Sequence, residues 1–175
     1  MVVIVAGLPG TGKSTLAEAV ARRTGAAVID KDRIRAALFA PQDIEYSSQQ
    51  DDFCMELMLQ TARYLLVRNP SRTVLLDGRT FSQAYQRDRV REYSESIAQP
   101  WLILECICAE TTALVRIARD VAAGSHPARN RTEELYTSVR TSWEPILQPS
   151  AIIDTDQPLE ACLRQALDCI GFADG

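Results

Sequence analysis

The chain has 175 residues, of which 46% are hydrophobic and 24% charged, as is usual for a globular enzyme. A chain of this length can bury a core of its own, so we expect a single domain spanning residues 1–175. A net charge of −4 excludes a global basic field that would attract nucleic acid, and no apolar stretch is long enough to span a membrane.

The first predicted element is an apolar strand, Val2 to Ala6, which begins too early to leave room for a signal peptide. The five cysteines form no C-x-x-C pair and are expected to be reduced. We therefore expect a cytoplasmic protein.

A phosphate-binding motif follows this strand directly, because Gly7 to Thr15 satisfy the pattern G-x-x-x-x-G-K-[ST]. Glycines let such a loop wrap a phosphate with its N–H groups pointing inward, and the helix that follows adds its positive end. The chain has two lysines against seventeen arginines, so a lysine in this loop indicates a chemical role. Lys13 would neutralise the β- and γ-phosphate oxygens, and Ser14 would bind Mg²⁺. The residues predicted to bind the nucleotide are Leu8, Pro9, Gly10, Thr11, Gly12, Lys13, Ser14 and Thr15.

Charged residues crowd the turn between a second predicted strand, Ala26 to Ile29, and a short helix, Lys31 to Phe39. A kinase needs a carboxylate that orients or deprotonates the acceptor hydroxyl, and an arginine that holds the acceptor. Asp32 and Arg35 are three residues apart and would share one helix face. The spacing leaves open a structural role, in which Asp30 or Asp32 is the N-cap of the helix.

A polar loop then leads to a predicted helix, Asp51 to Arg68. The residues expected to face the core are Phe53, Cys54, Leu57, Met58, Thr61, Tyr64 and Leu65. The third predicted strand, Thr73 to Asp77, is apolar and ends in an acid. Asp77 therefore matches the second-motif carboxylate of P-loop proteins, which holds Mg²⁺ through water.

The next predicted helix, Gln83 to Ala98, is rich in arginine. Arg87, Arg89 and Arg91, together with Arg79, could form a local basic track for nucleic acid. A solvated helix face is the alternative interpretation.

The rest of the chain continues the alternation of strands and helices. The predicted elements are a strand at Trp101 to Cys108, helices at Glu110 to Ala122 and Thr132 to Trp143, a strand at Ala151 to Asp154, and a helix at Leu159 to Ile170. The alternation predicts a three-layer α/β fold with a five-stranded parallel sheet, whose ligands bind at the carboxyl ends of the strands.

An irregular segment at about residues 120–131 predicts a lid that carries arginines. Arg116 and Arg119 precede it, and Arg129 and Arg131 lie within it. Such a lid would exclude water and stabilise the transferred charge, whereas a solvated basic face is the structural alternative.

These motifs together resemble the P-loop kinases of the polynucleotide-kinase-like group, which have an AAA-type ATP-binding domain. That group includes polynucleotide 5′-hydroxyl kinases, chloramphenicol phosphotransferase, gluconate kinases and the zeta toxins. The resemblance implies a P-loop NTPase fold, with Asp32 as the general base and Arg35 in contact with the acceptor. Asp120 departs from the pattern, because many relatives have further basic residues there. The resemblance rests on the phosphate-binding loop, Asp32-x-x-Arg35, Leu75-Leu76-Asp77-Gly78, Arg116, Arg119, and Val139-x-x-x-Trp143-Glu144-Pro145.

We therefore expect a Mg²⁺- and ATP-dependent kinase that transfers the γ-phosphoryl group to a hydroxyl of a small molecule, such as a sugar acid, a nucleoside or an antibiotic-like acceptor. Arg116 or Arg119 would stabilise the transferring group. A polynucleotide 5′-hydroxyl kinase is the first alternative. A nucleotide-binding switch or ATPase that regulates a partner is the second, but a switch needs no acceptor base such as Asp32. No guanine-reading motif is present, which favours ATP.

Overall fold

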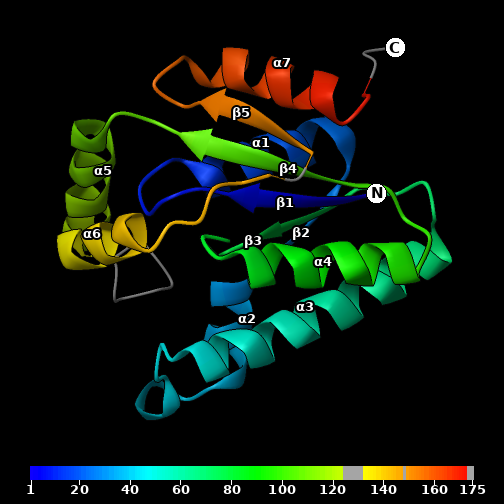
Figure 1. Ribbon diagram of the computed structural model, residues 1–175, viewed down its shortest axis with the longest axis horizontal. Coiled ribbons are helices and arrows are strands. Elements are labelled where there is room, and N and C mark those ends of the chain that lie inside the picture. The colour runs from blue at the N-terminus through cyan, green and yellow to red at the C-terminus, as the bar shows by residue number, and fades with distance from the viewer. Residues whose placement is uncertain (124–131, 148, 173–175) are drawn as a thin grey trace.

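The computed structural model describes residues 1–123, 132–147 and 149–172, which form a parallel sheet covered by helices (Figure 1). The strand order is β2-β3-β1-β4-β5, and every neighbouring pair is parallel. The strands are β1 (Val2–Ala6), β2 (Ala27–Asp30), β3 (Val74–Asp77), β4 (Trp101–Ile107) and β5 (Ser150–Asp154).

Seven α-helices and one short 3₁₀-helix are described between and after these strands. The α-helices are α1 (Lys13–Thr24), α2 (Lys31–Leu38), α3 (Ser48–Arg68), α4 (Ala84–Ser96), α5 (Glu110–Ala123), α6 (Glu133–Thr141) and α7 (Leu159–Cys169), and the 3₁₀-helix is Pro41–Asp43. No helix among the described residues combines the length and the apolar character that crossing a membrane requires.

The sheet is buried on both faces, which is why its strands are runs of apolar residues rather than alternating patterns. All five residues of β1 are fully buried. Val2, Ile4 and Ala6 face the core beneath α3 and α4, whereas Val3 and Val5 face the core beneath α1 and α7. The predicted three-layer α/β fold with a five-stranded parallel sheet is therefore confirmed (Figure 1).

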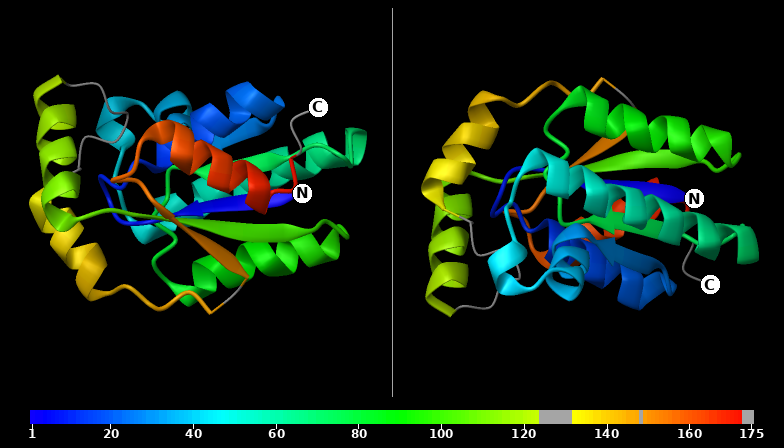
Figure 2. Two further views of the ribbon diagram at one scale, coloured as in Figure 1. Left: turned by 90° about the horizontal axis from the view of Figure 1, so that it is seen from above. Right: turned by 90° about the horizontal axis from the view of Figure 1, so that it is seen from below.

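The helices α5 and α6 lie apart from these layers, at the end of the sheet where the strands finish (Figure 2). Arg116 and Arg119 are on α5. Most of the predicted lid at about residues 120–131, including Arg129 and Arg131, lies outside the described residues.

The predicted core face of the long helix is only partly confirmed, because Cys54 and Met58 are buried but several of the other predicted residues are not. Phe53 and Tyr64 are 53% and 61% exposed, and Thr61 is exposed as well. The helix also buries apolar residues outside the predicted set, namely Met55, Leu59, Ala62 and Leu66. Apolar residues lie all around α3, so the sequence pattern does not fix which side meets the sheet, and packing against β2 and β3 decides it.

Candidate active site

The phosphate-binding loop connects β1 to α1 at the carboxyl edge of the sheet, and its backbone can be formed only by glycine at two points. Gly7 has φ +146°, and a Cβ there would lie 2.4 Å from the carbonyl oxygen of Cys106. Gly10 has φ +78°, and a Cβ there would lie 2.5 Å from the carbonyl oxygen of Ala113. Both contacts are too short for a side chain, so these glycines are required by the fold of the loop.

Lys13 opens α1 and is 94% buried beneath the loop, with an exposed fraction of 6%. Its Nζ donates hydrogen bonds to the carbonyl oxygens of Gly7 at 2.8 Å and Leu8 at 2.7 Å. The loop therefore fixes the ammonium group beside its own backbone, where the helix N-terminus adds further positive potential.

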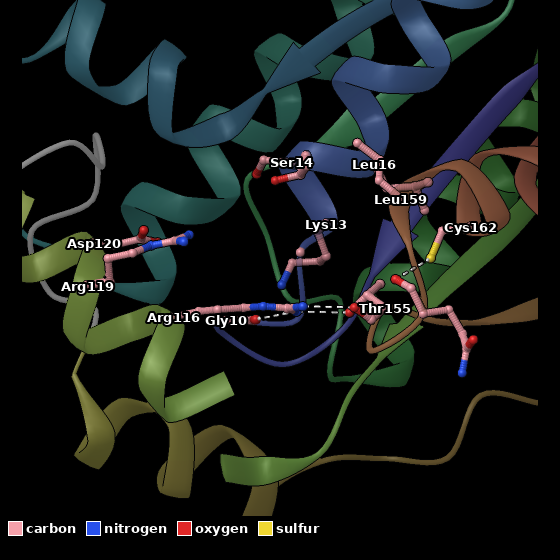
Figure 3. Close-up of a pocket in the computed structure, with 13 residues that line it drawn as sticks. Gly10, Lys13, Ser14, Leu16, Arg116, Arg119, Asp120, Thr155, Leu159 and Cys162 are labelled. Atoms are coloured by element: carbon pink, nitrogen blue, oxygen red, sulfur yellow. Dashed lines mark hydrogen bonds between the residues drawn. The ribbon is translucent and has the colours of Figure 1, made fainter. Parts of the chain in front are cut away.

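A cavity of about 410 Å³ opens on one side of this loop (Figure 3). The predicted residues Gly10, Gly12, Lys13, Ser14, Thr15, Arg116 and Arg119 line it, together with Leu16, Asp120, Thr155, Gln157, Leu159 and Cys162. The structure thus brings the loop and both predicted arginines of α5 to one cavity.

Arg116 connects the phosphate-binding loop to the turn after β5 (Figure 3). Its guanidinium donates to the carbonyl oxygen of Thr155 at 2.8 Å, to Thr155 Oγ1 at 3.1 Å and to the carbonyl oxygen of Gly10 at 3.4 Å. Thr155 Oγ1 in turn donates to the carbonyl oxygen of Thr11 at 3.0 Å. Sequence reasoning missed Thr155 and Gln157, although their position just after the last strand was a usable signal.

The predicted magnesium-binding residues face a second cavity, which Ser14 and Asp77 both line. Asp77 ends β3 and is 1% exposed, and its Oδ1 is buried without a hydrogen-bond partner. Such an unsatisfied carboxylate oxygen fits a hydrated cation at this point. Within the described part of the chain no cluster of three or more acidic, histidine or cysteine side chains could hold a metal, so nucleotide phosphates would have to supply further ligands.

The second cavity has a volume of about 170 Å³ and shares Lys13 and Ser14 with the first. Its walls come from the loop, α2, α3 and the segment before it, the turn after β3, α4 and α6. Its other lining residues are Pro9, Lys31, Asp32, Arg35, Tyr46, Asp51, Asp77, Gly78, Arg79, Thr80, Gln86, Leu135 and Val139. The predicted base Asp32 and the predicted acceptor-binding Arg35 therefore lie in one cavity with the lysine of the loop.

Four charged side chains form a network in this second cavity. Arg35 Nη1 lies 3.0 Å from Asp32 Oδ1, and Lys31 Nζ lies 3.3 Å from the same oxygen. Lys31 Nζ also lies 2.9 Å from Asp51 Oδ1, which Arg35 contacts too. Burial lowers the pKa of Lys31, and the neighbouring charge of Asp32 opposes that effect.

The structure separates the two candidate acids at the start of α2. Asp30 is the N-cap, because its Oδ1 accepts hydrogen bonds from the backbone N–H groups of Asp32 at 2.7 Å and Arg33 at 2.9 Å. Asp32 instead lines the second cavity. Both of its ion pairs use Oδ1, so Oδ2 takes part in neither.

Arg79 and the arginines of α4 do not form the local basic track that the sequence left open. Arg87 is 0% exposed and donates to the carbonyl oxygens of Phe81, Glu144 and Pro145. The other three arginines pair with acids: Arg79 with Asp52, Arg89 with Glu56, and Arg91 with Asp88, Glu92 and Glu95. Four charges that appear alike in the sequence are thus neutralised or buried, and they do not form a continuous positive surface.

A comparison with known protein families identifies the family of the chain. A family model described as an AAA domain (AAA_33) matches residues 2–143, so the chain belongs to this family. No curated protein matches the chain by sequence. Membership of the polynucleotide-kinase-like group remains a resemblance.

Solved structures show the same fold at low sequence identity. A presumed kinase from Chloroflexus aurantiacus is 19% identical, with a TM-score of 0.75 over 95% of this chain and 96% of that chain. The adenylylsulfate (APS) kinase CysC of Mycobacterium tuberculosis, in complex with AMPPNP and APS, is 17% identical, with a TM-score of 0.70 over 97% and 96%. A gluconokinase from Sinorhizobium meliloti is 18% identical, with a TM-score of 0.65 over 97% and 90%. The chain therefore has the P-loop NTPase fold.

Proposed function

We propose that this chain is a single-domain, ATP-dependent kinase that phosphorylates a hydroxyl group of a small molecule in the cytoplasm. The observation that carries the proposal is the meeting of two cavities at Lys13 and Ser14. One cavity has the features of a nucleotide site, and the other contains a carboxylate and an arginine suited to an acceptor hydroxyl. The similar structures support it, because their names describe kinases, including one for gluconate and one in complex with an ATP analogue.

Each residue has a separate role in the proposed reaction. The loop amides and Lys13 bind the β- and γ-phosphates, and Arg119 stabilises charge on the transferring group. Arg116 holds the loop against Thr155 and the nucleotide cavity. Ser14 directly and Asp77 through water would hold Mg²⁺, which neutralises phosphate charge when bound.

Asp32 acts on the acceptor in this proposal. Arg35 and Lys31 hold Oδ1, which leaves Oδ2 to accept the proton of the attacking hydroxyl. Arg35 also lies over the ring of Tyr46, with its guanidinium carbon 5.0 Å from the ring centre, so its position is fixed. A polynucleotide acceptor has little support, because the arginines of α4 are buried or paired.

The test compares Asp32→Asn with Asp30→Asn in single-turnover phosphoryl transfer and in ATP binding. Asn cannot accept the proton, so Asp32→Asn should slow transfer ~10²-fold or more while ATP affinity changes little. Asp30→Asn is the matched control, because Asn caps a helix about as well as Asp, and it should keep a near-normal rate. Equal rates in the two variants would exclude Asp32 as the base.

A further inference from the structure

The charges of the second cavity balance without a ligand. Lys31, Arg35 and Arg79 line it, and their side chains are 8%, 3% and 5% exposed. Lys31 and Arg35 share Asp32 and Asp51, and Arg79 Nη1 lies 2.7 Å from Asp52 Oδ1. Apart from Lys13 and Asp77, which also line the cavity, three cations therefore meet three carboxylates that belong to the protein itself.

The positions of these cations are fixed as well as neutralised. Arg35 lies over the ring of Tyr46, and Arg79 lies over the ring of Tyr85 with its guanidinium carbon 5.9 Å from the ring centre. Arg79 Nη2 also donates to the hydroxyl of Tyr85 at 3.1 Å. Turning either guanidinium toward a ligand would separate it from an acid and an aromatic ring, although the Nε atom of each arginine is buried without a hydrogen-bond partner.

This arrangement discriminates against a charged acceptor. A carboxylate or phosphate on the acceptor would compete with Asp51 for Lys31 or with Asp52 for Arg79, and it would lie close to the like charge of that acid. A hydroxyl group both donates and accepts, so it can donate to a carboxylate and accept from the paired cation while the ion pair stays intact. The wall of the cavity therefore matches a polyhydroxy compound better than an acid.

The size of the cavity limits the acceptor further. Its volume of about 170 Å³ is less than half of the 410 Å³ of the nucleotide cavity. It is also below the ~300 Å³ at which sites for drug-sized ligands begin. An acceptor with a single ring fits this space.

We propose that the acceptor is a compact, uncharged polyhydroxy compound, such as a monosaccharide or a cyclitol, and that Asp52 is a specificity-determining residue that excludes sugar acids and sugar phosphates by neutralising Arg79. This inference rests on the proposed kinase function. It narrows the sequence-based expectation, which included sugar acids.

The experiment measures acceptor-dependent ADP release with neutral aldoses and cyclitols and with the matching aldonic and uronic acids. The wild type should prefer the neutral member of a pair by at least ~10-fold in kcat/KM. Asp52→Asn frees the charge of Arg79 and should shift this preference toward the acid by at least ~10-fold. Glu56→Gln is the matched control one turn further along α3, where it removes only the exposed pair with Arg89, and should leave the preference unchanged.

Thermal melting of each variant accompanies the assay, so that a loss of folding is not read as a change in specificity. A wild type that prefers acids, uses no neutral compound, or responds equally to Asp52→Asn and Glu56→Gln would overturn the inference. Failure of the kinase function itself would look different, because ATP would then bind equally to the wild type and to Lys13→Ala, and no acceptor would stimulate ADP release.

Discussion

Replacing Arg87 with methionine tests whether this arginine is a structural clamp rather than part of a basic surface. Its side chain is fully buried and donates to Phe81 O at 2.7 Å, Pro145 O at 2.9 Å and Glu144 O at 3.2 Å. These bonds tie the turn after β3 to the segment that follows α6. Glu144 N reinforces the connection by donating to Ser82 O at 2.9 Å.

The expected cost follows from these contacts. A hydrogen bond from a charged donor contributes about 1.5–3 kcal/mol, so three would give at least about 4.5 kcal/mol. Burial lowers the pKa of Arg87, and the cost of removing its charge from water offsets part of this sum. We therefore expect Arg87→Met to lower the free energy of unfolding by about 3 kcal/mol. For a chain of this size, this corresponds to a decrease of about 6–12 °C in Tm.

The matched control is Arg89→Met on the same helix. Arg89 is 38% exposed and pairs with Glu56, which is 50% exposed. Such a surface pair contributes about 0–1 kcal/mol, so the control should lose less than about 4 °C. Thermal unfolding followed by circular dichroism measures both variants. Equal melting temperatures would refute the clamp.

Two further predictions concern the phosphate-binding loop and the edge of the sheet beside it. Gly10→Ala should weaken binding of an ATP analogue ~10-fold or more in calorimetry, because its Cβ would meet Ala113 O. Gly25→Ala is the control, because Gly25 has a similar φ of +73° and nothing within 4 Å of its Cβ position, and it should leave nucleotide affinity unchanged. Burial raises the pKa of Glu105 above its ordinary value, so the stability that its protonated form contributes is present at low pH and is lost as pH rises through the folded-state pKa. Glu105→Gln should therefore raise Tm at about pH 7 and have little effect at about pH 4, and the same gain at both pH values would contradict this account.

The alternation of strands and helices could be predicted because the buried strands of a parallel sheet are continuous apolar runs in the sequence. The strand Val2–Ala6 is buried on both faces and is therefore apolar throughout, and each helix begins or ends close to the predicted residue. The long helix Ser48–Arg68 ends at the predicted residue but starts earlier than predicted. Its N-cap is Ser47, whose side chain accepts from Gln50 N, so the helix begins three residues before the predicted start at Asp51.

The ion pairs that connect α2 and the turn after β3 to α3 could not be predicted, because their partners are distant in sequence. Lys31 and Asp51 are 20 residues apart, and Arg79 and Asp52 are 27 apart. The burial of Arg87 could not be predicted either. Arg87 and its exposed neighbour Arg89 are the same residue type, and only tertiary packing buries Arg87. Local motifs identify the phosphate-binding loop, but the packing of distant segments decides which side chains line the proposed acceptor cavity.

The most direct test of the proposed function follows the γ-phosphate itself. Phosphorus NMR or γ-labelled ATP should show phosphate moving from ATP to a hydroxyl of a neutral sugar or cyclitol in the wild type. Lys13→Ala should abolish most of this transfer while the fold persists, because losing one fixed charge at the transferring group costs ~3–4 kcal/mol of barrier. Near-normal transfer by a folded Lys13→Ala variant, or release of free phosphate by the wild type with every acceptor, would contradict a kinase centred on this loop.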